Sequence, residues 1–181
     1  MSSTKIALLR GINVGGHRKV PMAELRQLMT VLGFEQVKTY IQSGNIIFKS
    51  PVISTAELAL RIQNGILERF GFEVPVICLT AETLQQAVKN NPFATEATPL
   101  TQLHLSFLNK VPEKSLAEAL QEIDLSPDQF HLQNTFIYLN IPGKYHKTKL
   151  SNALFEKKLK VSATTRNWKT VLKLSELLQA Y

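Results

Sequence analysis

The sequence predicts an α+β fold in which one β-α-β-β-α-β unit with a trailing helix occurs twice. The first observation is that the spacing of apolar residues switches several times between a period of two, typical of strands, and a period of 3.6, typical of helices. The second is that the order of elements in the first half of the chain recurs in the second half. This order is that of the split βαβ unit, so we expect a tandem duplication of ferredoxin-like (α/β plait) units.

The first half supplies the elements in that order. Expected strands cover residues 5–10, 37–41, 45–49 and 74–79, and expected helices cover 21–32, 55–70 and 80–90. Pro21 suits a first helical turn, and Gly33 and Gly71 end two of the helices. A short turn containing Gly44 joins the second and third strands and is typical of a β-hairpin.

The second half repeats the pattern. Expected strands cover 103–108, 129–132, 135–140 and 161–166, and expected helices cover 112–123, 147–160 and 168–180. Residues 91–101, which include Pro92 and Pro99 and few large apolar side chains, read as a linker. We therefore expect a first ferredoxin-like subdomain at 1–91 and a second at 102–181.

Composition limits the class of protein. The chain has 181 residues, of which 44% are hydrophobic and 19% charged, which is typical of a globular protein rather than a disordered one. The single cysteine, Cys78, cannot form an internal disulfide, and it lies in an apolar run where a buried, inert thiol is expected. No apolar run approaches the length of a membrane span or a signal peptide. A cytoplasmic protein with no membrane partner is therefore expected.

The charge balance favours anionic partners. Lys and Arg number 21 and Asp and Glu 14, which gives a formal net charge of +7. Such a balance suits nucleic acid, phosphorylated metabolites or an acidic protein. Between residues 140 and 173 the only acidic residue is Glu156, whereas nine residues are basic: Lys144, Lys147, Lys149, Lys157, Lys158, Lys160, Arg166, Lys169 and Lys173.

The most informative feature is the first strand-to-helix loop. From Leu9 to Val20 there are eleven positions, whereas from Leu108 to Val111, the matching residues of the second half, there are three. Long connections of this kind are often functional. The extra residues belong to the segment 10–19, which contains three glycines, three cations, one His and one Asn. Because the first and second strands of such a unit run parallel, we expect this loop to lie beside the turn around Gly44.

The residues of the loop suggest an anion site. Glycines let backbone amides approach a ligand, and the following helix N-terminus favours negative charge. Arg10 and Lys19 would neutralise the ligand, and Asn13, Ser43 and Asn45 would orient it. Alternatively, the glycines only build an irregular turn. The loop lacks the Lys and Ser or Thr of a nucleotide-binding P-loop and the dinucleotide motif GxGxxG, so no nucleotide is implied.

A second candidate lies where the last strand meets the last helix. Arg166 and Trp168 could grip a phosphate and stack on a ring, or Trp168 could anchor the helix in the core while Asn167 caps it. The four histidines show no metal-ligand spacing, and Asp124 and Asp128 suit a turn rather than a catalytic pair. No metal or cofactor is expected, and no reaction is defined.

Three segments of the chain form a combined motif: Leu8-Leu9-Arg10-Gly11-Ile12-Asn13-Val14-Gly15-Gly16 with Lys19 and Met22, Thr39-Tyr40-Ile41-Gln42-Ser43-Gly44-Asn45, and Thr165-Arg166-Asn167-Trp168-Lys169-Thr170-Val171. Together they resemble a known bacterial family, designated domain of unknown function 1697. The resemblance covers essentially the whole chain and implies two ferredoxin-like subdomains in tandem, with no established activity. The residues expected to bind a ligand are Arg10, Asn13, Gly15, Gly16, Lys19, Tyr40, Ser43, Asn45, Arg166, Asn167 and Trp168.

Three functional hypotheses follow. The first is a protein that binds a small anionic ligand, such as a phosphorylated metabolite, at the long loop. The second is a nucleic-acid-binding protein that uses the basic region 144–173. The third is an interaction or structural protein without a ligand site. Several strands are apolar on both faces, which disfavours RNA binding on an open sheet face.

Overall fold

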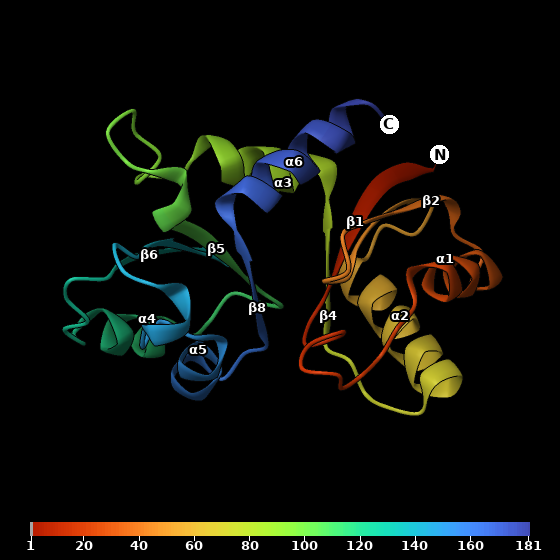
Figure 1. The fold of residues 1–181 in the computed structure, drawn as a ribbon, viewed down its shortest axis with the longest axis horizontal. Coiled ribbons are helices and arrows are strands. Elements are labelled where there is room, and N and C mark those ends of the chain that lie inside the picture. Colours follow the sequence, from red (N-terminus) through yellow and green to blue (C-terminus); the bar gives the residue numbers. More distant parts are fainter. Residues whose placement is uncertain (1) are drawn as a thin grey trace. The chain divides into compact units, whose positions relative to one another are not determined.

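The computed structural model describes residues 2–181, which form two four-stranded antiparallel sheets and six α-helices (Figure 1). By contacts the chain divides into two compact units. Unit 1 comprises Met1–Gln85 with Leu177–Tyr181, and unit 2 comprises Gln86–Glu176. Two helices, α3 (Ala81–Lys89) and α6 (Trp168–Gln179), therefore begin in one unit and end in the other. The division into two subdomains at 1–91 and 102–181 stays a prediction.

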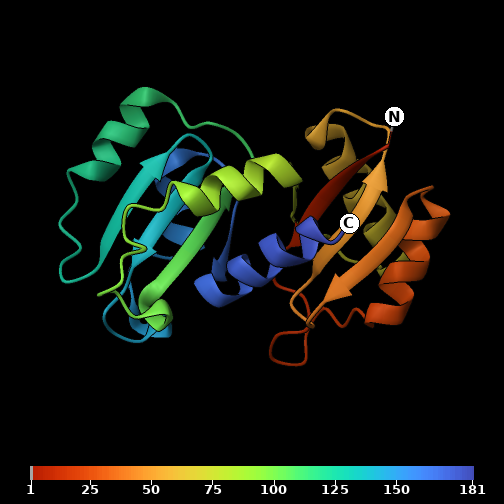
Figure 2. The same ribbon diagram turned by 90° about the horizontal axis from the view of Figure 1, so that it is seen from above.

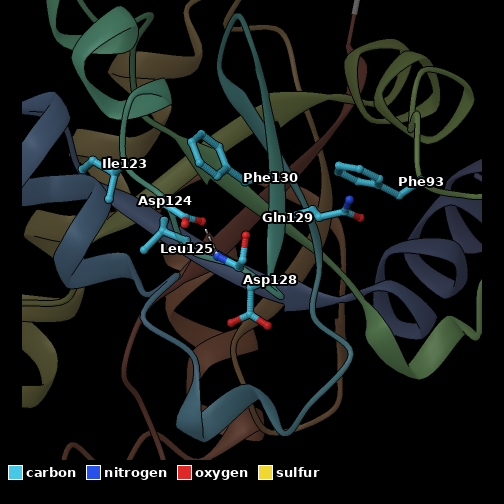
Figure 3. Close-up of a pocket in the computed structure, with 8 residues that line it drawn as sticks. Phe93, Ile123, Asp124, Leu125, Asp128, Gln129 and Phe130 are labelled. Carbon is cyan, nitrogen blue, oxygen red and sulfur yellow. Dashed lines mark hydrogen bonds between the residues drawn. The ribbon is translucent and has the colours of Figure 1, made fainter.

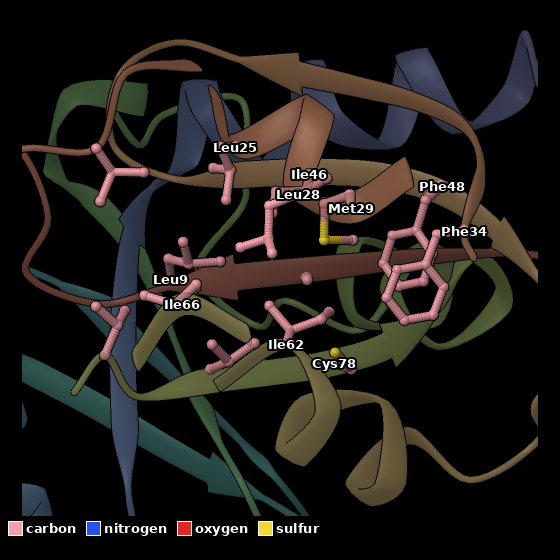
Figure 4. Close-up of a cluster of buried hydrophobic side chains, with 14 of the residues drawn as sticks. Leu9, Leu25, Leu28, Met29, Phe34, Ile46, Phe48, Ile62, Ile66 and Cys78 are labelled. Atoms are coloured by element: carbon pink, nitrogen blue, oxygen red, sulfur yellow. The ribbon is translucent and has the colours of Figure 1, made fainter. Parts of the chain in front are cut away.

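Unit 1 contains the first sheet, with strand order β2-β3-β1-β4 and every neighbouring pair antiparallel. Helices α1 (Met22–Val31) and α2 (Thr55–Phe70) pack on it around a buried apolar cluster that includes Leu9, Met29 and Ile62 (Figure 4). The strands are β1 (Ser3–Leu9), β2 (Glu35–Tyr40), β3 (Asn45–Ser50) and β4 (Val76–Thr80).

Unit 2 contains the second sheet, with the equivalent order β6-β7-β5-β8 and again only antiparallel pairs. Helices α4 (Lys114–Gln121) and α5 (Asn152–Leu159) contribute to its apolar cluster, in which Phe155 and Leu139 are fully buried. The strands are β5 (Leu103–Leu108), β6 (Gln129–Gln133), β7 (Phe136–Asn140) and β8 (Ala163–Asn167), and single 3-10 turns lie at Leu100–Gln102 and Tyr145–Lys147.

Helix ends follow local capping chemistry. The Ser54 hydroxyl accepts a hydrogen bond from the Glu57 amide, and Gly71 closes α2 with φ 78°, so this helix covers the predicted residues. The helix predicted at 147–160 is wrong at its start. Ser151 is the N-cap of α5 and accepts from the Leu154 amide, so the helix begins five residues later. The helix predicted at 112–123 is also shorter, because Glu113 is extended with ψ 140°.

The central strands are buried on both faces, as predicted. All four residues from Ile6 to Leu9 are 0% exposed, although alternate side chains of a strand point to opposite faces. In the second sheet, Ile137, Tyr138 and Leu139 are likewise buried, and the Tyr138 hydroxyl donates to the Ala87 carbonyl at 3.0 Å. An open apolar sheet surface on which RNA bases could stack is therefore absent from these strands among residues 2–181.

Candidate functional site

The long loop between β1 and α1 ends in a small hairpin of its own. The His17 amide donates to the Val14 carbonyl at 3.1 Å, and the Asn13 amide donates to the Arg18 carbonyl at 3.1 Å. The two central residues, Gly15 and Gly16, have φ of 59° and 78°. Two successive positive φ angles define the type I′ turn that suits tight hairpins, and glycine adopts them without steric cost. Figure 2 shows the loop extending past the end of the sheet of unit 1.

Asn13 fastens the base of this loop. Its side-chain oxygen accepts from the Val20 amide at 2.9 Å, and its side-chain nitrogen donates to the Val20 carbonyl at 3.0 Å and to the Gln42 carbonyl at 2.9 Å. Gln42 lies in the turn between β2 and β3. The loop and this turn are thus joined directly, which confirms that they lie at the same end of the sheet.

The turn between β2 and β3 is also fixed by hydrogen bonds of a buried asparagine. Asn45 is 0% exposed, and its side-chain nitrogen donates to the Tyr40 carbonyl and to the Ser43 hydroxyl, both at 3.0 Å. The Leu9 amide donates to the Gly44 carbonyl at 2.8 Å. A Cβ on Gly44 would lie 2.6 Å from the Leu9 Cβ, so only glycine permits this approach.

The loop has buried apolar residues at its base and exposed polar residues and glycines at its tip. Ile12 and Val20 are buried and anchor the loop in the core of unit 1, whereas Gly15, Gly16 and the run from His17 to Lys19 are exposed. Arg18 has φ 47°, and its Nη1 lies 3.5 Å from the position that a Cβ on Gly11 would occupy. The exposed Arg18 guanidinium therefore lies against bare glycine backbone, and the exposed Lys19 follows Arg18 in the chain.

Arg18 was not among the predicted ligand residues. The sequence shows that Arg18 carries a positive charge. The pattern of apolar residues does not show that its left-handed backbone places the side chain against Gly11. Eight of the predicted residues belong to unit 1, on the loop, on the turn or at the strand ends next to them: Arg10, Asn13, Gly15, Gly16, Lys19, Tyr40, Ser43 and Asn45. In Asn13 and Asn45, both hydrogens of the side-chain amide are donated within the protein, so these two residues shape the loop and the turn.

The other three predicted residues lie in unit 2. Arg166 is buried, and its Nη1 donates to the Thr164 hydroxyl at 2.9 Å and to the Thr165 carbonyl at 3.1 Å. Burial lowers the pKa of Arg166 to about 10, partly opposed by Tyr145. Asn167 caps α6, since its side-chain oxygen accepts from the Thr170 amide at 2.9 Å. Trp168 is 2% exposed. The fold therefore accounts for Asn167 and Trp168 without a ligand.

A partly buried polar cluster extends across β5 and β8 in the same unit. The Thr165 hydroxyl donates to the Asn152 side-chain oxygen at 2.7 Å, so it must accept the 2.6 Å hydrogen bond from the Ser106 hydroxyl. The His104 ring stacks on Tyr145 with centroids 4.4 Å apart, and burial lowers the pKa of His104. Because the Ser106 proton is committed to Thr165, this serine is a structural group rather than a nucleophile.

One cavity, of about 320 Å³, lies in unit 2 and is bordered by both aspartates of the chain together with Phe93 and Phe130 (Figure 3). Asp124 accepts from the Ser126 amide, and Thr148 donates to Asp128. Asp124 thus has the turn role expected from the sequence, and hydrogen bonds to Ser126 lower its pKa.

Metal-ligating residue types do not cluster in the described part of the chain, and its single thiol is buried. Residues 2–181 contain no group of three or more His, Cys, Asp or Glu that could hold a metal ion. Cys78 is buried, and burial raises its pKa to about 12, so the thiol is the unreactive neutral form at ordinary pH. None of the helices in this part of the chain is long and apolar enough to span a bilayer.

The fold and the loop define an α+β protein with two four-stranded antiparallel sheets, the first of which carries an enlarged basic, glycine-rich connection. The chain belongs to the family described as "Protein of unknown function (DUF1697)", whose sequence profile matches residues 2–138. This confirms the family suggested by the three motifs. A search of curated proteins gives no match.

A solved structure shares the whole fold. The chain is 29% identical to the protein described as conserved bacterial protein SP0830 from Streptococcus pneumoniae, and the match covers 98% of this chain and 99% of that one with a TM-score of 0.78. The similarity therefore extends over both units, and it carries no stated activity.

Proposed function

We propose that this protein binds a small anion, such as a phosphorylated metabolite, on the surface formed by the segment 10–19. The observation that carries the proposal is the exposed Arg18 guanidinium held 3.5 Å from the Cβ position of Gly11, with the exposed Lys19 next to it in the chain. A guanidinium presents paired N–H donors that match phosphate and carboxylate oxygens, and glycine leaves backbone amides open to the same ligand.

Two features of the neighbouring structure support this assignment. The hydrogen bonds of Asn13 and the burial of Ile12 and Val20 hold the loop in one shape before any ligand arrives. Less conformational entropy is then lost on binding. The loop also leads into α1, whose N-cap residue Pro21 makes no side-chain cap hydrogen bond, so the first amides and the helix dipole favour negative charge nearby.

Our proposal also includes the type of unit that each sheet forms and the location of the protein. The two strand orders, β2-β3-β1-β4 and β6-β7-β5-β8, support two ferredoxin-like units that arose by duplication. In this scheme the first copy gained the binding loop and the second kept a short connection. The lone buried cysteine suits a reducing compartment, and we propose a cytoplasmic location.

Isothermal titration and thermal shift against inorganic phosphate and a panel of phosphorylated metabolites test the proposal. A ligand at a hundredfold excess over its Kd adds about 2.7 kcal/mol of stability to the folded state. Arg18→Gln should weaken binding about tenfold, because a charge-assisted hydrogen bond is lost. Arg26→Gln, which removes an exposed guanidinium that donates to the Thr39 hydroxyl of β2 in the same unit, is the matched control and should bind as the wild type does. Equal affinities of wild type and Arg18→Gln for every anion that binds would reject this site.

A second candidate function rests on the surface of unit 2. Seven lysines of the basic region are exposed there, and these are Lys144, Lys147, Lys149, Lys157, Lys158, Lys160 and Lys169. Such a surface suits the phosphate backbone of a nucleic acid. Fluorescence anisotropy with a labelled RNA or DNA should then show affinity that falls steeply with salt and falls further in Lys157→Gln/Lys158→Gln. A complete lack of binding at low salt would remove this candidate.

A further inference from the structure

Two strands occupy the same place in the two sheets but differ in how they meet solvent. β2 is the edge strand of the order β2-β3-β1-β4, and β6 is the edge strand of the order β6-β7-β5-β8. An edge strand presents backbone N–H and C=O groups that can pair with another chain, so proteins usually protect such strands with charges, bulges or covering segments. The two edges can therefore be compared directly.

β2 carries all three kinds of protection. It includes the charged residues Glu35 and Lys38, and its register against β3 shifts between them at a bulge where Gln36 has φ 50°. The C-terminal Tyr181 covers this bulge, since its hydroxyl donates to the Gln36 carbonyl and the Lys38 Nζ lies 4.6 Å from its ring centroid. Pairing of β2 with another strand is thus blocked.

β6 has neither charged residues nor a bulge, and its first two residues, Gln129 and Phe130, border the cavity of unit 2 together with Phe93 and the turn at 123–128. Its sequence, Gln129-Phe130-His131-Leu132-Gln133, has no Lys, Arg, Asp, Glu or Pro. Its register against β7 is continuous over all five residues. Among residues 2–181, no backbone hydrogen bond joins β6 to a segment other than β7. Since strand residues alternate in direction, part of its backbone N–H and C=O groups face outward.

The sequence of β6 is also complementary to itself. In an antiparallel pair centred on His131, Gln129 faces Gln133 of the second copy and Phe130 faces Leu132 of the second copy, while His131 faces its own counterpart. Each pair therefore joins side chains of one kind, amide with amide and apolar with apolar, which is the favourable arrangement for cross-strand neighbours. Phe130 and Leu132 are half-buried against the apolar cluster of unit 2, so pairing would extend that core across both copies.

We propose that β6 is a homodimerisation edge, at which two copies of this chain pair antiparallel about His131 to form one continuous eight-stranded sheet. A two-fold axis through this position makes the interface isologous, so the association closes at a dimer. This inference does not depend on the anion site, because the loop 10–19 belongs to unit 1.

The first unit indicates which substitution should block pairing. Lys38 lies opposite Ile47, which lies opposite Ile6. His131 lies opposite Tyr138, which lies opposite Leu105. Ile6 and Leu105 hold equivalent places, two residues before the matched pairs Leu8-Leu9 and Phe107-Leu108. His131 is therefore the counterpart of Lys38, and His131→Lys transfers the charge that protects β2 onto β6.

Sedimentation equilibrium over a range of concentrations tests the proposal. The wild type should reach twice the 20.3 kDa mass of one chain. His131→Lys should raise the dimer dissociation constant about tenfold or more, because two like charges face each other across the axis. Ala153→Lys is the matched control: it adds the same charge at an exposed site on α5, which packs against β8 at the opposite edge of the sheet. This variant should dimerise as the wild type does.

Amide hydrogen exchange gives a second readout that does not depend on the variants. Exchange at residues 129–133 should slow as the wild-type concentration rises, while exchange at 35–40 should not change. A wild type that keeps the mass of one chain at all concentrations overturns the proposal. So does a dimer that His131→Lys leaves intact, or one whose residues 129–133 exchange equally fast at low and high concentration.

Discussion

Gly44→Ala tests the close contact that joins the loop to the turn. Gly44 has φ 82°, and a Cβ there would lie 2.6 Å from the Leu9 Cβ and 2.9 Å from the Ile12 Cδ1. The Leu9 Cβ is fixed to β1, and the 2.8 Å hydrogen bond from the Leu9 amide to the Gly44 carbonyl holds the two backbones together. A rotamer change therefore cannot relieve the contact, and the turn must move away from the strand.

The magnitude has two parts that a control separates. A non-glycine residue in the left-handed region costs about 1–2 kcal/mol, and overpacking of a buried site costs typically about 1–3 kcal/mol more. Gly33 has φ 81°, but an added Cβ there would meet no heavy atom within 4 Å, so Gly33→Ala incurs only the backbone cost. We expect Gly44→Ala to lose about 2–5 kcal/mol of unfolding free energy and Gly33→Ala about 1–2 kcal/mol.

Urea unfolding followed by circular dichroism measures both values. If the two variants lose the same free energy, the close approach between the turn and Leu9 does not exist in solution, and the geometry assigned to the site fails with it. If Gly44→Ala loses more, the difference measures the steric part, since the φ angles of the two glycines, 82° and 81°, are nearly the same.

Three further predictions concern groups described above. Asn13→Ala removes three hydrogen bonds and should cost about 2–3 kcal/mol, with faster tryptic cleavage after Arg18 and Lys19; unchanged cleavage would contradict the role of Asn13. Burial holds the pKa of His104 below its usual value near 6.5, so the folded state binds fewer protons than the unfolded state and stability should fall as pH drops below that value. In His104→Gln this part of the pH dependence should disappear from thermal melts, and a full wild-type pH profile in the variant would refute it. Tyr181→Phe keeps the ring near Lys38 but loses the hydroxyl donor to Gln36; it should cost about 1 kcal/mol and speed amide exchange at 35–38, and equal exchange rates would argue against the contact.

Local capping chemistry explains how much of the fold the sequence could predict. Helix α2 has a serine N-cap and a glycine at its end, so residues next to the helix in sequence determine where it begins and ends. The predicted helix at 147–160 starts too early, although the N-cap of α5, Ser151, is itself a neighbouring residue, because the contacts that keep the preceding residues out of the helix are partly distant. There the Thr148 hydroxyl accepts from the Leu150 amide and donates to Asp128, and that carboxylate lies 20 residues away in the sequence.

The candidate site likewise has one feature that the sequence predicts and others that depend on distant residues. That the loop lies beside the turn follows from the parallel run of β1 and β2, so topology alone predicts it. Which side chains remain open to a ligand depends on partners far along the chain: Asn13 reaches Gln42, 29 residues away, and is thereby used within the fold. Arg18 could be counted as a cation but not placed, because its position depends on a positive φ that its residue type seldom adopts.

The differences between the two units are more informative than their likeness. Units with one strand order need the same apolar faces, so the core says little about function. The units diverge at two exposed places: unit 1 has eight extra residues before α1, and unit 2 lacks the charges, the bulge and the covering tyrosine that protect β2. The exposed residues of the loop from Gly15 to Lys19 add nothing to the core, and an unprotected edge carries a risk of aggregation. A ligand loop in one unit and a pairing edge in the other would account for both departures, and each can be removed by substitution without disturbing the other.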